Sequence, residues 1–399
     1  MVLKFLVYFM NLRAKLDIFF RIPKYFRNFA LVFRNNAPKI IMTLHIFNPE
    51  HDIALASGLS NFTAPHAGRQ LRHDLGFLPA LWAKEDDVIM VDDTEQAERE
   101  WRKIRHRIST LQVHGGLLTV NPRFTYSKPH VCLRQTTAVE PWGWNSALKA
   151  QLLRYGIDES IMPTDAQLQT IRELSHRRIA ATLLPELRME GTVGEAFECQ
   201  EPEQVEALLA QYGQVVMKAP WSSSGRGLRF LSVERTPFQM QAGWFRNVVA
   251  TQGSVMVEPY YNKVKDIGME FYANEQGQIF YLGLSLFHTT NGAYTGNILA
   301  TETTKRNMIS NYIPVDLLKY VQEKICNELS DIFNGRYQGP FGVDMMICNG
   351  SLLHPCVEIN LRRTMGHVAL ALSPADDDIR CVMRIDYSES TYKLKINKL

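Results

Sequence analysis

Four polar residues near the end of the chain have the types and spacing of a cation-binding site. Glu358, Asn360 and Arg362 form the pattern E-x-N-x-R at the end of an apolar run, and Asp344 lies in the apolar run before it. An Asn-Gly pair separates the two runs, which predicts a β-hairpin. Because alternate side chains of a strand point to one face, the three motif residues should project together. Carboxylate and amide oxygens can bind a hard cation, and the arginine can hold an anion bound to it. A solvated edge strand would give the same pattern.

A second candidate site lies upstream, where an apolar strand that ends in Lys218 is followed by a loop of small residues and by another strand. Small residues let backbone N–H groups approach phosphate oxygens, and the lysine adds a positive charge. The lysine precedes the glycines and we expect no helix after them, which excludes a Walker-type loop. The loop residues of interest are Ser223, Ser224, Gly225 and Gly227.

In their order along the chain, these features resemble the ATP-grasp superfamily. The strand with Lys218 comes first, then the Ser/Gly loop, then Glu258 in V-x-V-E-P, and finally an acid 14 positions before E-x-N-x-R. The resemblance extends from Ile171 to Leu372. It implies an α/β fold in the ATP-grasp arrangement, in which an N-terminal parallel α/β domain precedes two ATP-grasp subdomains that hold the nucleotide between their sheets.

The resemblance also implies roles for individual residues. ATP is the expected nucleotide, with one or two Mg²⁺ ions, or Mn²⁺ in their place, bound by Asp344, Glu358 and Asn360. The expected catalytic residues are Arg362, which would stabilise the transferred phosphoryl group and the oxyanion, and Lys218, which would neutralise phosphate charge. The expected nucleotide contacts are Arg177, Lys218, Ser223, Ser224, Gly225, Gly227, Glu258 and Glu270. The alternatives are a solvated basic face around Arg177, with Arg178 as its rival, and a surface carboxylate at Glu258.

Four further residues are expected to contact the substrate. His51 and Asp52 follow the first predicted strand, at the carboxyl end where parallel α/β domains bind ligands. A turn that caps a helix through Asp52 is the alternative interpretation. Tyr294 and Asn297 lie in a polar, Gly-rich segment, His288–Ala300, of a length that often forms a binding loop.

The pattern of apolar runs divides the chain into five parts. We expect a leader (1–41), an N-terminal α/β domain (42–165), a small ATP-grasp subdomain with the loop (166–250), a large subdomain (251–385), and a tail (386–399) with the alternation of an edge strand. Within the N-terminal domain we expect strands at Leu44–Phe47, Asp87–Val91 and Gly115–Val120, and helices at Arg69–Ala83, kinked at Pro79, and Ser146–Tyr155.

The leader differs in composition from the rest of the chain. Residues 1–41 carry eight basic residues and one acidic residue, which is +7, and the whole chain carries +3, which leaves −4 elsewhere. That balance argues against a nucleic-acid partner. Charges interrupt every apolar cluster, so no run reaches the roughly 20 residues of a membrane-spanning helix. The leader is either a basic amphipathic segment on a membrane surface or untranslated sequence before a true start at Met42. We favour the second, because a strand begins there.

The predicted function is an ATP- and Mg²⁺-dependent ligase that activates a carboxylate as an acylphosphate and joins it to an amine or thiol of a small molecule or peptide. The alternatives are a kinase of the same fold with a small-molecule acceptor, and a nucleotide-binding module without turnover. The six cysteines have no CxxC or paired spacing, and no HExxH motif occurs, which argues against disulfides and zinc and for the reducing cytoplasm. We expect no nucleic-acid partner and no stable membrane span; a homodimer is compatible with the resemblance.

Overall fold

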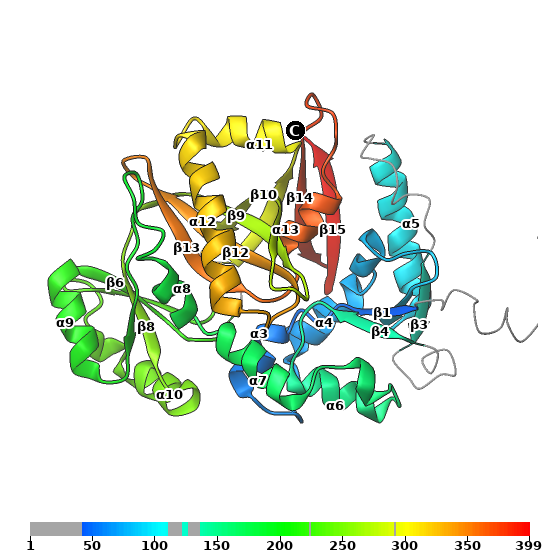
Figure 1. Ribbon diagram of the computed structural model, residues 1–399, viewed down its shortest axis with the longest axis horizontal. Coiled ribbons are helices and arrows are strands. Elements are labelled where there is room, and N and C mark those ends of the chain that lie inside the picture. Colours follow the sequence, from blue (N-terminus) through cyan, green and yellow to red (C-terminus); the bar gives the residue numbers. More distant parts are fainter. Residues whose placement is uncertain (1–41, 111–121, 127–135, 223–224, 291–292) are drawn as a thin grey trace, which may run out of the picture. The chain divides into compact units, whose positions relative to one another are not determined.

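The computed structural model describes residues 42–110, 122–126, 136–222, 225–290 and 293–399 (Figure 1). The predictions for the leader, for a strand at Gly115–Val120, and for Ser223 and Ser224 lie outside the described residues. The described part contains one parallel sheet and two antiparallel sheets. None of its helices combines the length and the apolar composition that crossing a lipid bilayer requires.

The first sheet is parallel and contains four strands in the order β3-β2-β1-β4. Apolar residues of β1 and β2 are buried, as expected of parallel strands that are covered on both faces. One face packs against α5 through Trp101 and Ile104, and the other packs against α6 through Leu148 and Leu152. The strands are β1 (Thr43–Ile46), β2 (Val88–Val91), β3 (Arg123–Tyr126) and β4 (Ala138–Pro141), and the helices are α5 (Thr94–Thr110) and α6 (Ser146–Arg154). The predicted parallel α/β unit is confirmed.

The helix predicted at Arg69–Ala83 is divided in the structure. Helix α4 ends at Leu75, and a short 3-10 turn follows over Leu78–Leu81. Pro79 has no N–H to donate to the Leu75 carbonyl, so an α-helix cannot continue through it. Two further helices belong to this part of the chain: α3 (His51–Ser57), which precedes α4 (His66–Leu75), and α7 (Asp165–Leu174), which Thr164 caps.

The second sheet is antiparallel, with four strands in the order β5-β8-β6-β7. Helices α9 (Pro202–Tyr212) and α10 (Ala242–Gln252) supply apolar side chains that pack with Val215 and Met217 of β6. Because side chains alternate along a strand, Val216 and Lys218 point to the other face. The strands are β5 (Phe197–Cys199), β6 (Gln214–Lys218), β7 (Leu228–Ser232) and β8 (Val255–Pro259).

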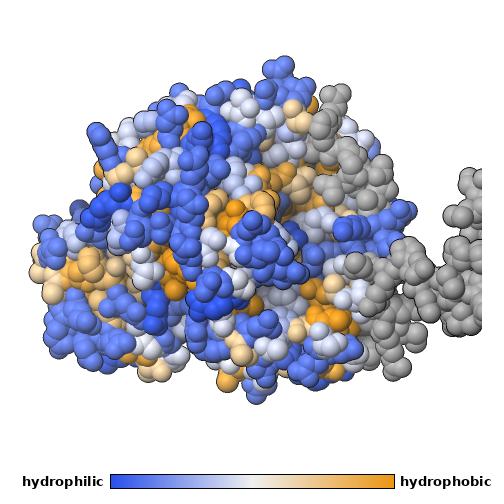
Figure 2. All heavy atoms as spheres, in the orientation of Figure 1, coloured by the Kyte–Doolittle hydropathy of each residue, from blue (hydrophilic) through white to orange (hydrophobic). Residues whose placement is uncertain are grey.

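The third sheet is antiparallel, with seven strands in the order β13-β12-β9-β10-β11-β14-β15. Its main core joins Ile267, Met269 and Phe271 of β9 to the buried side of α12, and Figure 2 shows the outer side of α12 as mostly hydrophilic. The strands are β9 (Lys263–Ala273), β10 (Ile279–Thr290), β11 (Ala293–Leu299), β12 (Gly339–Cys348), β13 (Leu352–Asn360), β14 (Cys381–Ser388) and β15 (Thr391–Lys398), and the helices are α8 (Arg178–Leu183), α11 (Glu302–Ile309), α12 (Val315–Phe333) and α13 (Met365–Ala371).

The edge strand expected in residues 386–399 is confirmed, because they complete β14 and form the edge strand β15. Two other expectations for this region need correction. The segment His288–Ala300, expected as a binding loop, mostly belongs to β10 and β11, which pair with each other. The hairpin is confirmed as β12 and β13, but β13 ends at Asn360, so Arg362 lies beyond the strand.

Candidate functional site

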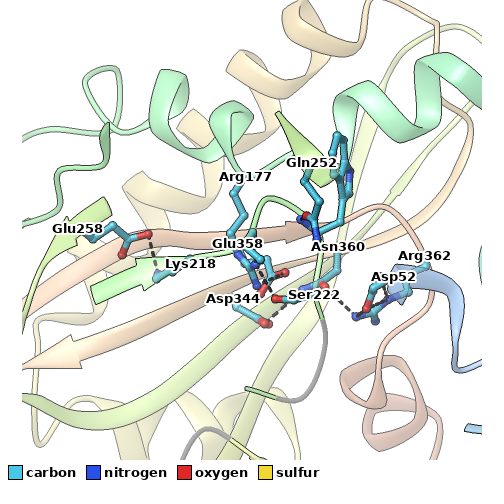
Figure 3. Close-up of polar contacts among 12 residues, drawn as sticks. Asp52, Arg177, Lys218, Ser222, Gln252, Glu258, Asp344, Glu358, Asn360 and Arg362 are labelled. Carbon is cyan, nitrogen blue, oxygen red and sulfur yellow. Dashed lines mark hydrogen bonds and ion pairs between the residues drawn. The ribbon is translucent and has the colours of Figure 1, made fainter. Parts of the chain in front are cut away.

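Acidic side chains gather on one face of the third sheet. Asp344 of β12 lies opposite Glu358 of β13, and Gly342 lies between Asn360 on one side and Glu270 of β9 on the other. These positions are two residues apart on each strand, so their side chains point to the same face. Figure 3 shows Asp344, Glu358 and Asn360 grouped together.

Asp344, at the centre of this group, is hydrogen-bonded to an amide and forms no ion pair with another described residue. Asn360 Nδ2 donates to Asp344 Oδ2 at 3.2 Å. Burial, followed by the charges of Glu358 and Glu270, raises the pKa of Asp344 to about 8. Among the described residues no three His, Cys, Asp or Glu side chains are arranged as metal ligands, so the candidate set is two carboxylates and one amide. Such oxygen donors fit a hard cation such as Mg²⁺.

Arg177 connects the acidic group to the base of the Ser/Gly loop. Its Nη2 donates to Glu358 Oε1 at 2.7 Å and its Nη1 to Ser222 Oγ at 2.8 Å, with a further hydrogen bond to the Ala219 carbonyl. Arg178 instead pairs with Glu198 at 3.1 Å, and its side chain is 51% exposed. Of the two rival arginines, the structure therefore brings Arg177 to the site. Ser222 was not predicted, because nothing in the sequence separates it from the serines that follow.

The Ser/Gly loop is tied to the strands at both of its ends. Ala219 N donates to the Gly227 carbonyl at 2.8 Å, and Leu228 N donates to the Gly225 carbonyl at 3.3 Å. A side chain at Gly227 would clash with Ser222. Gly225 has a φ of 70°, in the left-handed region that favours glycine. The backbone conformation therefore favours glycine at position 225, and the Ser222 side chain leaves no room for a side chain at position 227.

Lys218 and Glu258 form a buried ion pair on the face of the second sheet opposite α9 and α10. Lys218 Nζ lies 2.6 Å from Glu258 Oε1, and the two side chains are 8% and 6% exposed. His354 of β13 lies 4.0 Å from Glu258 Oε2, and burial, assisted by the Lys218 charge, lowers the pKa of His354 to about 3.

The pKa of the Cys356 thiol depends on charges from both this ion pair and the acidic group. Burial raises the pKa of the Cys356 thiol, Glu258, Asp344 and Glu358 raise it further, and Lys218 lowers it. Charges from both groups therefore act on one buried thiol of β13.

Arg362 is held mainly by Asp52 from the N-terminal domain (Figure 3). Its Nε and Nη2 donate to the two Asp52 oxygens at 2.9 and 2.7 Å, Nη2 also donates to Asn360 Oδ1 at 2.8 Å, and Nη1 donates to the Arg363 carbonyl at 3.1 Å. Since a guanidinium has five N–H groups, one remains for another acceptor. Asp52 therefore lies beside the motif, as the partner of its arginine.

The other predicted residues lie deeper in the protein. Burial lowers the pKa of His51 to about 4, and its Nδ1 lies 3.3 Å from Asn145 Nδ2. Glu270 accepts from Thr364 Oγ1 at 2.8 Å and lies 2.9 Å from His367 Nδ1.

Tyr294 and Asn297 contact each other rather than the acidic group. Tyr294 OH donates to Asn297 Oδ1 at 2.5 Å, and Asn297 Nδ2 donates to Ser285 Oγ at 2.8 Å. Ser285 pairs with Gly268, which in turn pairs with Asp344. These residues form a polar layer beside the acidic group, and in the described part of the chain they make no hydrogen bond to Asp344, Glu358 or Asn360.

Comparisons with known proteins give matches at the level of structure alone. No protein-family model matches the sequence, and no curated protein matches it significantly. The biotin carboxylase–β-γ-ATP complex from Campylobacter jejuni is 11% identical, with a TM-score of 0.50, over 89% of this chain and 79% of that one. Phosphoribosylamine–glycine ligase from Thermotoga maritima is 12% identical, with a TM-score of 0.50, over 88% of this chain and 82% of that one. The predicted α/β architecture is confirmed, because the chain shares its fold with these two structures.

Proposed function

We propose that this protein is an ATP- and Mg²⁺-dependent ligase that activates a carboxylate as an acylphosphate and joins it to an amine or a thiol. The observation that carries the proposal is the arrangement of charges around the late hairpin. Two carboxylates and an amide lie on one sheet face, and two cations, Lys218 and Arg177, reach the region from other elements.

Both cations are paired with carboxylates, Lys218 with Glu258 and Arg177 with Glu358. The phosphates of ATP would compete for both, since charge-assisted hydrogen bonds to phosphate oxygens are strong. Arg177 would then release Glu358. Asp344, Glu358 and Asn360 would hold Mg²⁺, which when bound would supply positive charge beside the β- and γ-phosphates.

Arg362 has a narrower role than a free anion-binding arginine. Most of its N–H groups are used by Asp52, Asn360 and the Arg363 carbonyl. It would therefore orient Asn360 and offer its one remaining N–H to the oxyanion of the acyl transfer. No covalent intermediate with a side chain is required, because the phosphorylated carboxylate is itself the activated group.

The names of the two similar structures agree with this reaction class. One is a carboxylase bound to an ATP analogue and the other is a ligase that joins an amine to glycine. At their level of identity they support the fold, and the choice of reaction rests on the site. We also propose that the protein is cytoplasmic. The cysteines that the structure describes are all free, which is typical of a reducing compartment.

The test is a screen for ADP release with Mg²⁺, ATP and pools of amino acids, peptides and carboxylates, followed by mass detection of a joined product. We expect at least one pool to give ADP, free phosphate and a condensed product. Phosphorus NMR distinguishes a kinase, which would leave the phosphoryl group on the acceptor. ATP binding with no ADP formed from any pool would instead indicate a nucleotide-binding module.

A further inference from the structure

A cavity of about 190 Å³ lies in the N-terminal α/β domain and contains none of the predicted site residues in its wall. It is bounded by the turn before α3, by helix α4 and by helix α6. A smaller cavity shares Asn48, Arg72 and Gln151 with it and reaches Ile46 and Val91, the last residues of β1 and β2. The pair of cavities therefore opens at the carboxyl edge of the parallel sheet, where open α/β sheets bind ligands.

The wall of the larger cavity is positively charged. Arg69 and Arg72 of α4 and Arg154 of α6 line it, against Glu50 as the one acidic lining residue. Arg69 donates one hydrogen bond to the Ala64 carbonyl, which leaves most of its N–H groups available. Arg154 is exposed and has no hydrogen bond or ion pair to another described residue. Such a wall favours an anionic ligand, because guanidinium groups bind carboxylate and phosphate in bidentate fashion.

Glu50 adds an unsatisfied acceptor to this wall. The residue is 8% exposed, and its Oε1 accepts a hydrogen bond from Arg72 Nη1 at 2.5 Å. Its Oε2 is buried without a hydrogen-bond partner among the described residues. A buried oxygen without a donor is unfavourable, so Glu50 can accept a hydrogen bond from a molecule bound in the cavity.

We propose that this cavity binds a small substrate through its anionic group, a carboxylate or a phosphate held by the arginines, and through an amino or hydroxyl group that donates to Glu50. Its volume corresponds to about six water molecules at about 30 Å³ each, enough for that part of a small metabolite. The inference rests on the proposed function, since the molecule would be one of the two that the ligase joins. Glu50 lies two residues before Asp52, the partner of Arg362. One short segment of the chain therefore contributes both to the cavity wall and to the contact with the E-x-N-x-R motif.

The experiment is isothermal titration without ATP, using L-glutamate, glycerol 3-phosphate and inorganic phosphate as probes. The first two separate a carboxylate ligand with an amino group from a phosphate ligand with hydroxyl groups. We expect one of them to bind the wild-type protein, and R154Q and E50Q each to weaken that binding about 10- to 100-fold. R99Q is the matched control, since Arg99 is an exposed arginine on α5 of the same domain, 56% exposed and outside the cavity.

Two results would overturn the inference: no binding of any probe, or binding that R154Q and E50Q leave unchanged. The inference would also be overturned if inorganic phosphate were the one probe that binds and E50Q bound it as tightly as the wild-type protein. These outcomes are separate from failure of the proposed function. ADP release in the acceptor screen without probe binding would reject the cavity and keep the ligase, whereas probe binding by the wild-type protein with no ADP release from any acceptor pool would keep the cavity and reject the ligase.

Discussion

Two buried ion pairs serve the candidate site in different ways. Lys218 and Glu258 belong to neighbouring strands of one small sheet and leave the lysine with two unused N–H groups. Arg362 and Asp52 are 310 residues apart in the chain and use nearly all of the arginine's N–H groups. In the proposed function the first pair would exchange partners when a phosphate binds, whereas the second joins the N-terminal domain to the late hairpin. A motif arginine is therefore not necessarily a free anion-binding group.

The largest expected effect comes from removing Lys218 of the first pair or Glu358 of the acidic group. Lys218→Ala and Glu358→Ala should each lower ATP turnover by about 10²–10³, because each takes away a group directed at charge that develops in the reaction. ADP release under saturating Mg²⁺ and ATP measures this. Lys218→Met and Glu358→Gln keep the side-chain volume and control for packing. Unchanged ADP release in all four variants would remove both residues from the site.

The second pair should act mainly on stability. Asp52→Asn or Arg362→Gln should lower the free energy of unfolding by about 2–3 kcal/mol, since each leaves its partner's charge without compensation. The side chains are 13% and 16% exposed, so partial hydration places the cost toward the lower end of the range. Urea denaturation measures it.

A double variant sharpens the comparison between the pairs. If Asp52 and Arg362 stabilise the fold through their contact with each other, the double variant Asp52→Asn/Arg362→Gln should lose less free energy of unfolding than the sum of the two single variants. Additive losses, together with a turnover defect confined to Arg362→Gln, would show instead that the arginine acts on the phosphate and that the contact with Asp52 is incidental.

Each pair has a buried histidine beside it, which predicts sensitivity to acid. Burial lowers the pKa of His51 to about 4 and that of His354 to about 3, against an ordinary value near 6.5. Both are neutral in the folded protein, whereas the unfolded chain takes up the protons below about pH 6.5. Stability is therefore fully present above that pH and is lost as the pH falls, by about 1.4 kcal/mol for each histidine at pH 5.5. His51→Gln or His354→Gln should flatten the dependence of the urea midpoint on pH between 6.5 and 5, and an unaltered slope would contradict the burial argument.

Local sequence patterns predicted the hairpin of this site better than they predicted the contacts of its arginines. Alternating apolar residues and an Asn-Gly turn were enough to place β12 and β13 and to set Asp344 beside Glu358. The preference for Arg177 over Arg178 and the pairing of Arg362 with Asp52 depend on how separate elements pack, which no local period encodes. The Gly-rich segment after β10 was mistaken for a loop because its strand, β11, pairs with distant β14.

The smallest expected effect belongs to Ser222, at the junction between the loop and the acidic group. Ser222→Ala removes the hydroxyl that accepts from Arg177 Nη1 but leaves the hydrogen bonds to the Ala219 carbonyl and to Glu358. A single such hydrogen bond contributes about 1 kcal/mol, so the KM for ATP should rise about fivefold, with little change in kcat if Arg177 acts in binding. Arg178→Gln is the matched control, because that side chain pairs with Glu198 away from the site. An equal rise in KM in both variants would mean that general positive charge, rather than the contact of Arg177 with the loop, attracts the nucleotide.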